Sequence, residues 1–349
     1  MSRWRRVALV FAIANLVAPA ALAQSGADYF KGKTITYIVA TNPGGGYDAY
    51  GRLVAEYMQR YLPGSTVVVR NMPGAGHLVG ANAIFAARPD GLTIGTFNTG
   101  LIYNQLIKHP GVRFDLNRMS WVGKAASEGR IMAIAQQSPI KSYQDLVAQT
   151  QPVNFAAAGI GSAAYVETVM LTTALKLPIK ILTGYNGNDD MLAMRRGEVV
   201  GTISARSTWD PMIRNGYARY IAQIGGDETD VPQLSTMVTD PAAKALIALI
   251  QTQCDVARLT AGPPGIPPDR LDALRAAFRK SMEDKELLAK TEKLGLPIQP
   301  AYGDTVLAMI KEALAQSPET IALLAESLKR SRRVPGAAQH KSWCVADAL

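Results

Sequence analysis

The sequence predicts an α/β protein built from two lobes, and three observations support this prediction. Predicted strands and helices alternate along almost the whole chain, an order that is typical of parallel sheets covered by helices on both faces. The chain has 349 residues, more than a single hydrophobic core usually serves. A strand, a glycine-rich loop and an amphipathic helix occur in this order twice, once in each expected lobe. With 48% hydrophobic residues, each lobe can bury its own core.

Residues 1–23 have the features of an export signal. Three arginines among the first six residues form the positive start, the run Val7–Val17 is apolar, and Ala-Leu-Ala ends at Ala23. Small residues at these positions suit the signal peptidase, so the mature chain is predicted to begin at Gln24. Because the apolar run is too short to span a bilayer, we expect an exported protein without a membrane anchor.

The first strand, loop and helix occupy residues 34–61. Ile35–Ala40 is rich in β-branched and aromatic residues and predicts a buried strand. Three glycines end the strand, and apolar residues at helical spacing from Ala49 to Tyr61 predict an amphipathic helix. Such a helix N-terminus, after a loop without side chains, offers unpaired N–H groups to an anion. The candidate ligand-binding residues here are Pro43, Gly44, Gly45, Gly46, Tyr47 and Asp48.

This stretch also has a simpler interpretation. A tight turn between a strand and a helix can bind nothing at all. Asp48 could serve only as a cap for the helix that follows the loop. An aspartate at this place would also repel a ligand carboxylate unless water or a ligand amino group lies between them.

The remaining elements follow from the same patterns. Strands are predicted at 66–70, 92–97, 130–135, 153–158, 179–183, 199–204, 217–224 and 254–261, with a further one near Trp121. Helices are predicted to end near Ala87, Thr150, Leu175 and Gly197, and others follow Asp240 and Pro268 to about Arg333. Ser142 and Asp145 have the spacing of a capping box, and Pro241 follows an aspartate that can cap a helix.

The second lobe repeats the first glycine loop. Gly159–Ser162 follows a strand and precedes a helix, so two helix N-termini could face each other across a cleft as an anion clamp. Loops at other strand ends should lie on the same rim. Ser162 could also be only an N-cap. The further candidates are Gly74, Ala75, Gly76, Gly161, Ser162, Tyr185, Asn186, Gly187 and Ser204.

Composition and motifs exclude several function classes. The formal net charge is +9, but the excess of basic residues is spread along the chain, which suits a small anion better than nucleic acid. The chain has 3 histidines and lacks HExxH, CxxC and Gly-x-Ser-x-Gly, so metal-hydrolase, thiol-redox and serine-hydrolase sites have no core residues. The glycines of the first loop do not have the Gly-x-Gly-x-x-Gly spacing of a dinucleotide site. We therefore predict a binding protein without a cofactor, not an enzyme.

The ordered set of motifs resembles the Bug family, the periplasmic receptors of tripartite tricarboxylate transporters, over nearly the whole mature chain. The matching residues are Pro43-Gly44-Gly45-Gly46 with Asp48, Asn71-x-Pro73-Gly74-Ala75-Gly76, Pro89-Asp90-Gly91, Gly159-x-Gly161-Ser162, Tyr185-x-Gly187, Gly197-Glu198-Val199 and Pro263-Pro264-Gly265-Ile266-Pro267.

The resemblance implies a type II periplasmic binding protein, with two Rossmann-like lobes, a ligand cleft and a hinge. It implies that the first glycine loop holds a carboxylate, partly through water, and that the loops at Ser162 and at 185–187 close over it. The expected partner is a tripartite membrane transporter, and the protein is expected to be a periplasmic monomer. A receptor of the same fold that signals to a membrane kinase is the alternative.

Departures from the family pattern bear on the ligand. Tyr47 stands where the family usually has Thr or Ser, Tyr165 where it often has His, Asn186 where it commonly has Lys, and Gly201 where it frequently has Asp. These changes remove charge partners and add aromatic surface. They favour a mono- or dicarboxylate with an apolar or aromatic body over a tricarboxylate.

The lobe boundaries and the cysteines complete the prediction. We expect residues 24–128 with 258–349 to form the first lobe, residues 129–257 the second, and a hinge near Ala125 and Asp255. The chain has 2 cysteines, and export favours a bridge between Cys254 and Cys344, with two free thiols as the alternative.

Two further side chains are open to more than one interpretation. His77, which follows the loop Pro73-Gly74-Ala75-Gly76, could donate to a ligand or lie on the surface. Arg206, near a strand end, could bind a carboxylate or face solvent.

Overall fold

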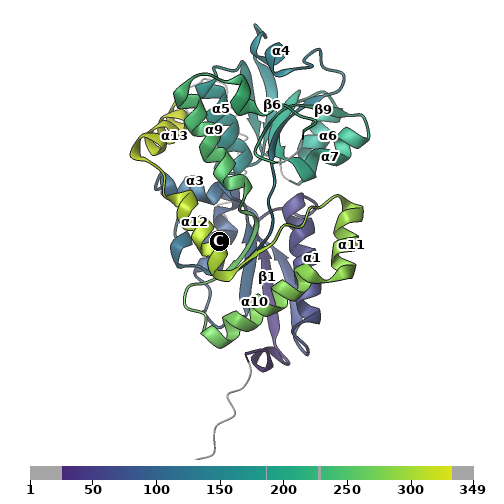
Figure 1. Ribbon diagram of the computed structural model, residues 1–349, viewed down its shortest axis with the longest axis vertical. Helices are drawn as coiled ribbons and strands as arrows, with labels where there is room; N and C mark the ends of the chain where they lie inside the picture. Colours follow the sequence, from purple (N-terminus) through teal and green to yellow (C-terminus); the bar gives the residue numbers. More distant parts are fainter. Residues whose placement is uncertain (1–25, 186, 227–228, 332–349) are drawn as a thin grey trace, which may run out of the picture.

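The computed structural model describes residues 26–185, 187–226 and 229–331, and these form two lobes, one above the other (Figure 1). Each lobe is built on its own mixed sheet. The six-stranded sheet has the strand order β11-β4-β10-β3-β1-β2, and with its helices we call it the first lobe. The five-stranded sheet has the order β7-β6-β8-β5-β9 and forms the second lobe.

The first lobe contains the described N-terminal segment and much of the C-terminal half. Its strands are β1 (Thr34–Val39), β2 (Thr66–Asn71), β3 (Thr93–Phe97), β4 (Ser120–Ala126), β10 (Ala257–Gly262) and β11 (Ala301–Tyr302). Its helices are α1 (Gly46–Arg60), α2 (Leu78–Phe85), α3 (Gly100–Leu106), α10 (Pro268–Glu283), α11 (Lys285–Leu294) and α12 (Gly303–Leu314), with short 3-10 turns at Asp28–Phe30, Ala75–His77 and Leu116–Arg118.

The second lobe is formed mainly by the middle of the chain. Its strands are β5 (Arg130–Ala135), β6 (Val153–Ala157), β7 (Ile179–Thr183), β8 (Gly201–Ala205) and β9 (Ala218–Ile224). Its helices are α4 (Tyr143–Val147), α5 (Ala163–Ala174), α6 (Asp189–Arg195), α7 (Arg206–Arg214), α8 (Leu234–Met237), α9 (Pro241–Cys254) and α13 (Pro318–Ser331).

The sheets are not purely parallel, and this corrects the sequence-based prediction. β1 pairs parallel with β2 and β3, but β10 pairs antiparallel with β3 and β4. In the second sheet β5 is antiparallel to β8 and β9. The reason is the connectivity, because β5 and β10 each enter their sheet from the other lobe. They therefore start at the edge where the other central strands end.

Helices cover both faces of the first sheet, as the alternation of elements predicts. Consecutive residues of β1 show this, because Tyr37 and Val39 are buried in one apolar cluster with Tyr57 and Ile38 is buried in another. The first cluster lies under α1 and α10, and the second lies under α2, α3 and α12. This double covering leaves the carboxyl ends of β1 and β3 as the edge of the sheet that faces the other lobe.

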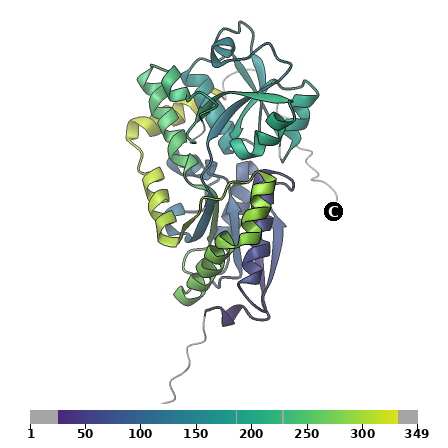
Figure 2. The same cartoon turned by 45° about the vertical axis from the view of Figure 1, so that its right-hand side comes forward.

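Several chain segments connect the lobes, and they lie side by side. The N–H of Glu128 donates to the carbonyl of Cys254 at 2.8 Å, and Ala126 pairs with Ala257. A later segment crosses between α12 and α13, so that α13 packs on α5 and α9 of the second lobe (Figure 2). This packing differs from the expected assignment of all residues of 258–349 to the first lobe, and the exact lobe boundaries remain our proposal.

Three predictions lie wholly or partly outside the described residues. These are the export signal at 1–23, the start at Gln24, and the bridge to Cys344. The other cysteine, Cys254, is buried at the end of α9. Among the helices that the structure describes, none is long and apolar enough to cross a membrane.

Candidate ligand-binding site

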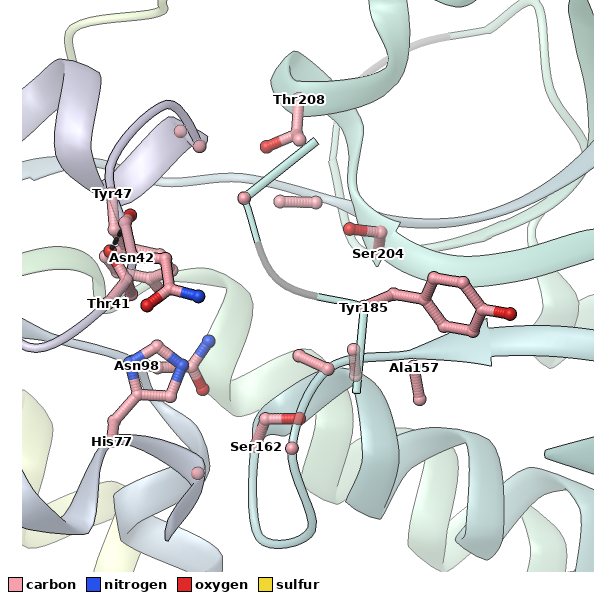
Figure 3. A pocket seen from close by; sticks show the side chains of 18 of the residues that line it. Thr41, Asn42, Tyr47, His77, Asn98, Ala157, Ser162, Tyr185, Ser204 and Thr208 are labelled. Atoms are coloured by element: carbon pink, nitrogen blue, oxygen red, sulfur yellow. Dashed lines mark hydrogen bonds between the residues drawn. The ribbon is translucent and has the colours of Figure 1, made fainter. Parts of the chain in front are cut away.

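A cavity of about 350 Å³ lies between the two lobes, with side chains of both lobes in its wall. Figure 3 shows Thr41, Asn42, Tyr47, His77 and Asn98 of the first lobe on one side of it. Opposite them it shows Ala157, Ser162, Tyr185, Ser204 and Thr208 of the second lobe. Both strand edges and helix starts therefore meet at this cavity, as expected for an α/β cleft.

The first glycine loop gives the cavity a helix N-terminus. Gly45 is the N-cap of α1 and has an extended backbone. The first bond of the helix runs from the N–H of Ala49 to the carbonyl of Gly45, at 3.0 Å. The N–H groups of Gly46, Tyr47 and Asp48 precede this bond and have no acceptor within the helix. Since Gly46 and Tyr47 line the cavity, the positive end of α1 is directed at it.

Asp48 holds this loop together and does not line the cavity. Its carboxylate is buried and accepts hydrogen bonds from the N–H of Gly44 at 3.0 Å, from Arg52 at 2.9 Å and from Asn71 at 2.9 Å. Burial opposes its ionisation, but these hydrogen bonds outweigh burial and hold the pKa of Asp48 below its ordinary value. Asp48 therefore has structural contacts, but it does not cap the helix as the simpler interpretation expected, because Gly45 is the N-cap and Asp48 holds the N–H of Gly44 instead.

Glycines allow the two lobes to touch around the cavity. A Cβ added to Gly45 would lie 3.1 Å from the Cα of Gly187 across the cleft. A Cβ on Gly76 would lie 2.5 Å from the carbonyl oxygen of Ile160, closer than real Cβ atoms come. Gly76 and Gly187 also have positive φ angles, +61° and +63°. The glycine loops thus serve as the contact points between lobes as well as the wall of the cavity.

The second glycine loop is capped from both lobes. The hydroxyl of Ser162 accepts from the N–H of Tyr165 at 3.3 Å, which makes Ser162 the N-cap of α5. The side-chain oxygen of Asn98, in the first lobe, accepts from the N–H of Ala163 at 3.0 Å. Asn104, on α3, donates to the carbonyl of Gly161 at 2.9 Å. Two N–H groups at this helix start are therefore already occupied, that of Ala163 across the cleft and that of Tyr165 by its own N-cap, so the expected anion clamp is weaker on this side.

An arginine that sequence analysis missed lies in the wall next to the first loop. Nη2 of Arg258 lies 2.7 Å from Oε2 of Glu128, and both side chains are almost completely buried. The guanidinium also lies over the rings of Tyr47 and Tyr50, at 4.3 and 4.7 Å from their centres. Burial opposes its charge, but Glu128 outweighs burial and raises the pKa of Arg258. The backbone of Arg258 is left-handed, with φ of 57°, a conformation that non-glycine residues rarely hold.

A second buried ion pair involves the other arginine of the cavity wall. Nη2 of Arg130 lies 2.5 Å from Oε2 of Glu167 on α5, and Glu167 is buried. The hydroxyl of Tyr103, on α3 of the first lobe, donates to Oε1 of Glu167 at 3.2 Å. Burial raises the pKa of Glu167, and the neighbouring Arg130 counteracts this. Both arginines that line the cavity are thus paired with buried carboxylates.

His77 lies in the cavity wall, as one of its two interpretations predicts. Its side chain is buried and its ring centre lies 5.9 Å from that of Tyr47. Burial lowers the pKa of His77 to about 4, although a hydrogen bond to the backbone of Ala40 opposes the shift. The imidazole is therefore neutral at neutral pH. Its Nδ1 has no hydrogen-bond partner among the described residues. Since the other ring nitrogen of the neutral imidazole donates to the backbone of Ala40, Nδ1 can accept a hydrogen bond from a ligand.

The predicted site residues fall into three groups. Ten of them line the cavity: Gly45, Gly46, Tyr47, Gly74, Ala75, Gly76, Ser162, Tyr185, Gly187 and Ser204. Pro43, Gly44, Asp48 and Gly161 do not, and Asn186 lies outside the described residues. The ring of Tyr185 packs on an apolar cluster of the second lobe. That these residues bind a ligand stays a prediction.

Arg206 does not reach the cavity. Its Nη2 lies 3.1 Å from a carboxylate oxygen of Asp230, and its Nε lies 3.5 Å from Asp210. The residues that the prediction missed are chiefly Arg130 and Arg258, together with Thr41, Asn42, Asn98, Asp190 and Thr208. No local sequence pattern predicts that these residues line the cavity, because their positions depend on how segments distant in the sequence pack together. Across the described ranges, no group of three potential metal ligands gathers.

Comparison with known proteins agrees with this architecture. A model of the tripartite tricarboxylate transporter family receptor matches residues 51–324. A protein encoded between tcbD and tcbE in Pseudomonas sp. strain P51 is 26% identical over 281 residues, which cover 77% of this chain and 80% of that protein.

Solved structures share the fold. The periplasmic binding protein BugD superposes with a TM-score of 0.70 at 21% identity, over 84% of this chain and 97% of BugD. MatC from Rhodopseudomonas palustris, solved with bound malate, has a TM-score of 0.64 at 21% identity, over 86% of this chain and 97% of MatC. These likenesses show that the two lobes have the architecture of periplasmic binding proteins.

Proposed function

This chain belongs to the tripartite tricarboxylate transporter receptor family, and from this membership we propose that it captures a small organic carboxylate outside the cytoplasm and delivers it to a tripartite membrane transporter. The observation that carries the proposal is the cavity of about 350 Å³ between two lobes, to which the N-terminus of α1 is directed. The protein would work in the periplasm as a monomer, after cleavage behind Ala23. The malate bound to MatC supports a carboxylate as the ligand.

The first lobe would hold the carboxylate through its backbone. The free N–H groups at the start of α1 are donors, and charge-assisted hydrogen bonds of this kind contribute about 1.5–3 kcal/mol each. Asn42 and Thr41, at the end of β1, add polar side chains on the same side. Gly46 is needed here, because a Cβ on it would lie 2.8 Å from Oγ1 of Thr208 and 2.9 Å from Nη2 of Arg258. The glycine keeps the helix start open to the ligand.

Closure of the lobes would complete the site. The loops of the second lobe touch the first lobe at Gly45 and Gly76 without room for a side chain. Such close contacts exist only when the lobes are together, so the described conformation is a closed one. A ligand that bridges both walls would stabilise it by its differential affinity for the closed form. The hinge would be the segments near Ala125 and Asp255, which lie side by side.

A ligand screen with a pair of variants tests the proposal. The mature chain would be screened for thermal stabilisation by mono-, di- and tricarboxylates, and the strongest ligand measured by calorimetry. Gly45→Val should lower the affinity at least tenfold, about 1.4 kcal/mol, because its side chain blocks the helix start and the contact with Gly187. Arg206→Ala, which changes a residue outside the cavity, should bind normally. A chain that no carboxylate stabilises, or a Gly45→Val variant that binds like the unaltered protein, would overturn the proposal.

A further inference from the structure

Asp190 differs from the other charged groups of the cavity because it has no positive partner. It lies in the first turn of α6 and lines the cavity. Its Oδ1 accepts from the N–H of Met191 at 2.9 Å. Among the described residues, no salt bridge reaches its carboxylate, and the one charged group that acts on it is Asp189, which repels it.

The arginines in the wall cannot balance this charge. Arg258 is paired with Glu128 at 2.7 Å, and Arg130 with Glu167 at 2.5 Å. Each pair is neutral as a unit, and neither arginine is among the charged groups that act on Asp190. His77 is neutral at neutral pH because burial lowers its pKa to about 4. The charged groups in the wall and their partners therefore sum to one negative charge when Asp190 is ionised.

Asp190 is half-buried, and an ionised carboxylate that is partly removed from water is stabilised by a positive partner or neutralised by a proton. Burial raises the pKa of Asp190 to about 7, and the charge of Asp189 adds to this. A dicarboxylate would place two further negative charges in the same cavity, with no free cation in the described wall to meet them. A ligand with one carboxylate and one cationic nitrogen would bring no net charge and would supply the missing partner.

We propose that the ligand of this cavity is a zwitterion, an amino acid or another amino carboxylate, whose carboxylate meets the N-terminus of α1 and whose cationic nitrogen meets Asp190. The inference rests on the proposed function and specifies its substrate class. Asp190 would act as the specificity residue, because its charge favours a ligand with an ammonium group and disfavours a dicarboxylate of the same length. Neither glycine loop can make this distinction, since a backbone N–H group recognises any carboxylate.

Ligands of matched length test the inference. For carbon chains of the sizes of malonate, succinate and adipate, calorimetry would compare the dicarboxylate with the monocarboxylate, the α-amino acid and the ω-amino acid of that length, for example succinate with butanoate, 2-aminobutanoate and 4-aminobutanoate. We expect an amino carboxylate to bind at least tenfold more tightly than the dicarboxylate of its length. Asp190→Asn keeps the size of the side chain and the acceptor for Met191, and should weaken the amino carboxylate at least tenfold while leaving or improving the dicarboxylate.

A neighbouring variant provides the control. Asp189→Asn makes the same change in charge at an exposed residue outside the cavity, and should alter neither affinity by more than about twofold. If a dicarboxylate binds more tightly than both amino carboxylates of its length and Asp190→Asn leaves that preference unchanged, the inference is wrong while the proposed function stands. If no carboxylate in the panel binds, the proposed function fails and the inference with it.

Discussion

The guanidinium of Arg258 and the carboxylate of Glu128 form an ion pair, 2.7 Å apart, that is almost completely buried beside the cavity between the lobes. Glu128 lies in the segment that leads from the first lobe to the second, and Arg258 lies in the strand that returns. The hydroxyl of Ser207, on α7 of the second lobe, also donates to Glu128. The pair thus joins the connecting segment, the first lobe and the second lobe in one polar network.

Glu128→Gln should destabilise the protein strongly. The substitution leaves Arg258 buried without a counter-charge, for which we expect a loss of about 3–5 kcal/mol in the free energy of unfolding. The exposed pair of Glu326 and Arg330, 3.1 Å apart, provides the control, because Glu326→Gln should cost less than about 1 kcal/mol. Urea unfolding of both variants measures the difference. Equal small losses would show that the buried pair is not needed for stability.

Gly76→Ala should impair binding more than stability. Gly76 and Gly216 have similar positive φ angles, +61° and +69°, but only a Cβ on Gly76 would meet the opposite lobe, whereas nothing lies within 4 Å of one on Gly216. Both alanine variants should lose about 1 kcal/mol from backbone strain. Only Gly76→Ala should lose affinity for the ligand, at least tenfold, because the lobes cannot close. Calorimetry measures this, and equal affinities would mean that closure does not need the contact.

His77 should make the stability of the protein depend on pH. Its folded pKa is about 4 against an ordinary value of 6.5, so its contribution is complete above pH 6.5. As the pH falls from 6.5 towards 4, the unfolded chain binds a proton that the folded protein does not, and about 3 kcal/mol of stability is lost.

His77→Asn removes this titration and keeps a residue that tolerates the φ of 79°. The free energy of unfolding should therefore fall less between pH 7 and pH 4.5 in the variant, because the two proteins share every other group that titrates in this range. Denaturant unfolding at the two pH values decides this. Parallel losses in both proteins would mean that His77 is protonated in the folded state.

Local patterns were sufficient to predict most of the elements. The capping box of Ser142 and Asp145 is present at the start of α4, and Asp240 caps α9 with Pro241 in its first turn. These features depend on residues that are neighbours in the sequence, so the sequence alone is enough to predict them. The direction of β5 and β10 depends on a crossing between lobes, and this is why the prediction of parallel sheets was wrong for these two strands.

The charged residues of the site could not be predicted in the same way. Arg258 carries no motif, and its position in the wall depends on Glu128 and Tyr47, which are distant in sequence. Arg206 looked suitable because it follows a strand, yet it starts α7 and pairs with Asp230 outside the cavity. Glycine loops are visible in a sequence, whereas ion pairs between segments are visible only when the segments pack.

The cysteines give the last prediction, a bridge between Cys254 and Cys344 in the exported protein. Burial raises the pKa of Cys254 to about 12, so a free thiol there would stay protonated and react slowly. Cys254 also lines a second cavity, of about 270 Å³, beside the segments that connect the lobes, and this gives a partner room to approach. The bridge would close a long loop and stabilise the protein by about 4–5 kcal/mol in the loop-entropy model. Without a reductant, the Cys344→Ser variant should have a free energy of unfolding that is lower by this amount than that of the unaltered protein. With a reductant present, the two proteins should be equally stable. Mass spectrometry of unreduced periplasmic protein gives the direct answer, and two free thiols there would contradict the prediction.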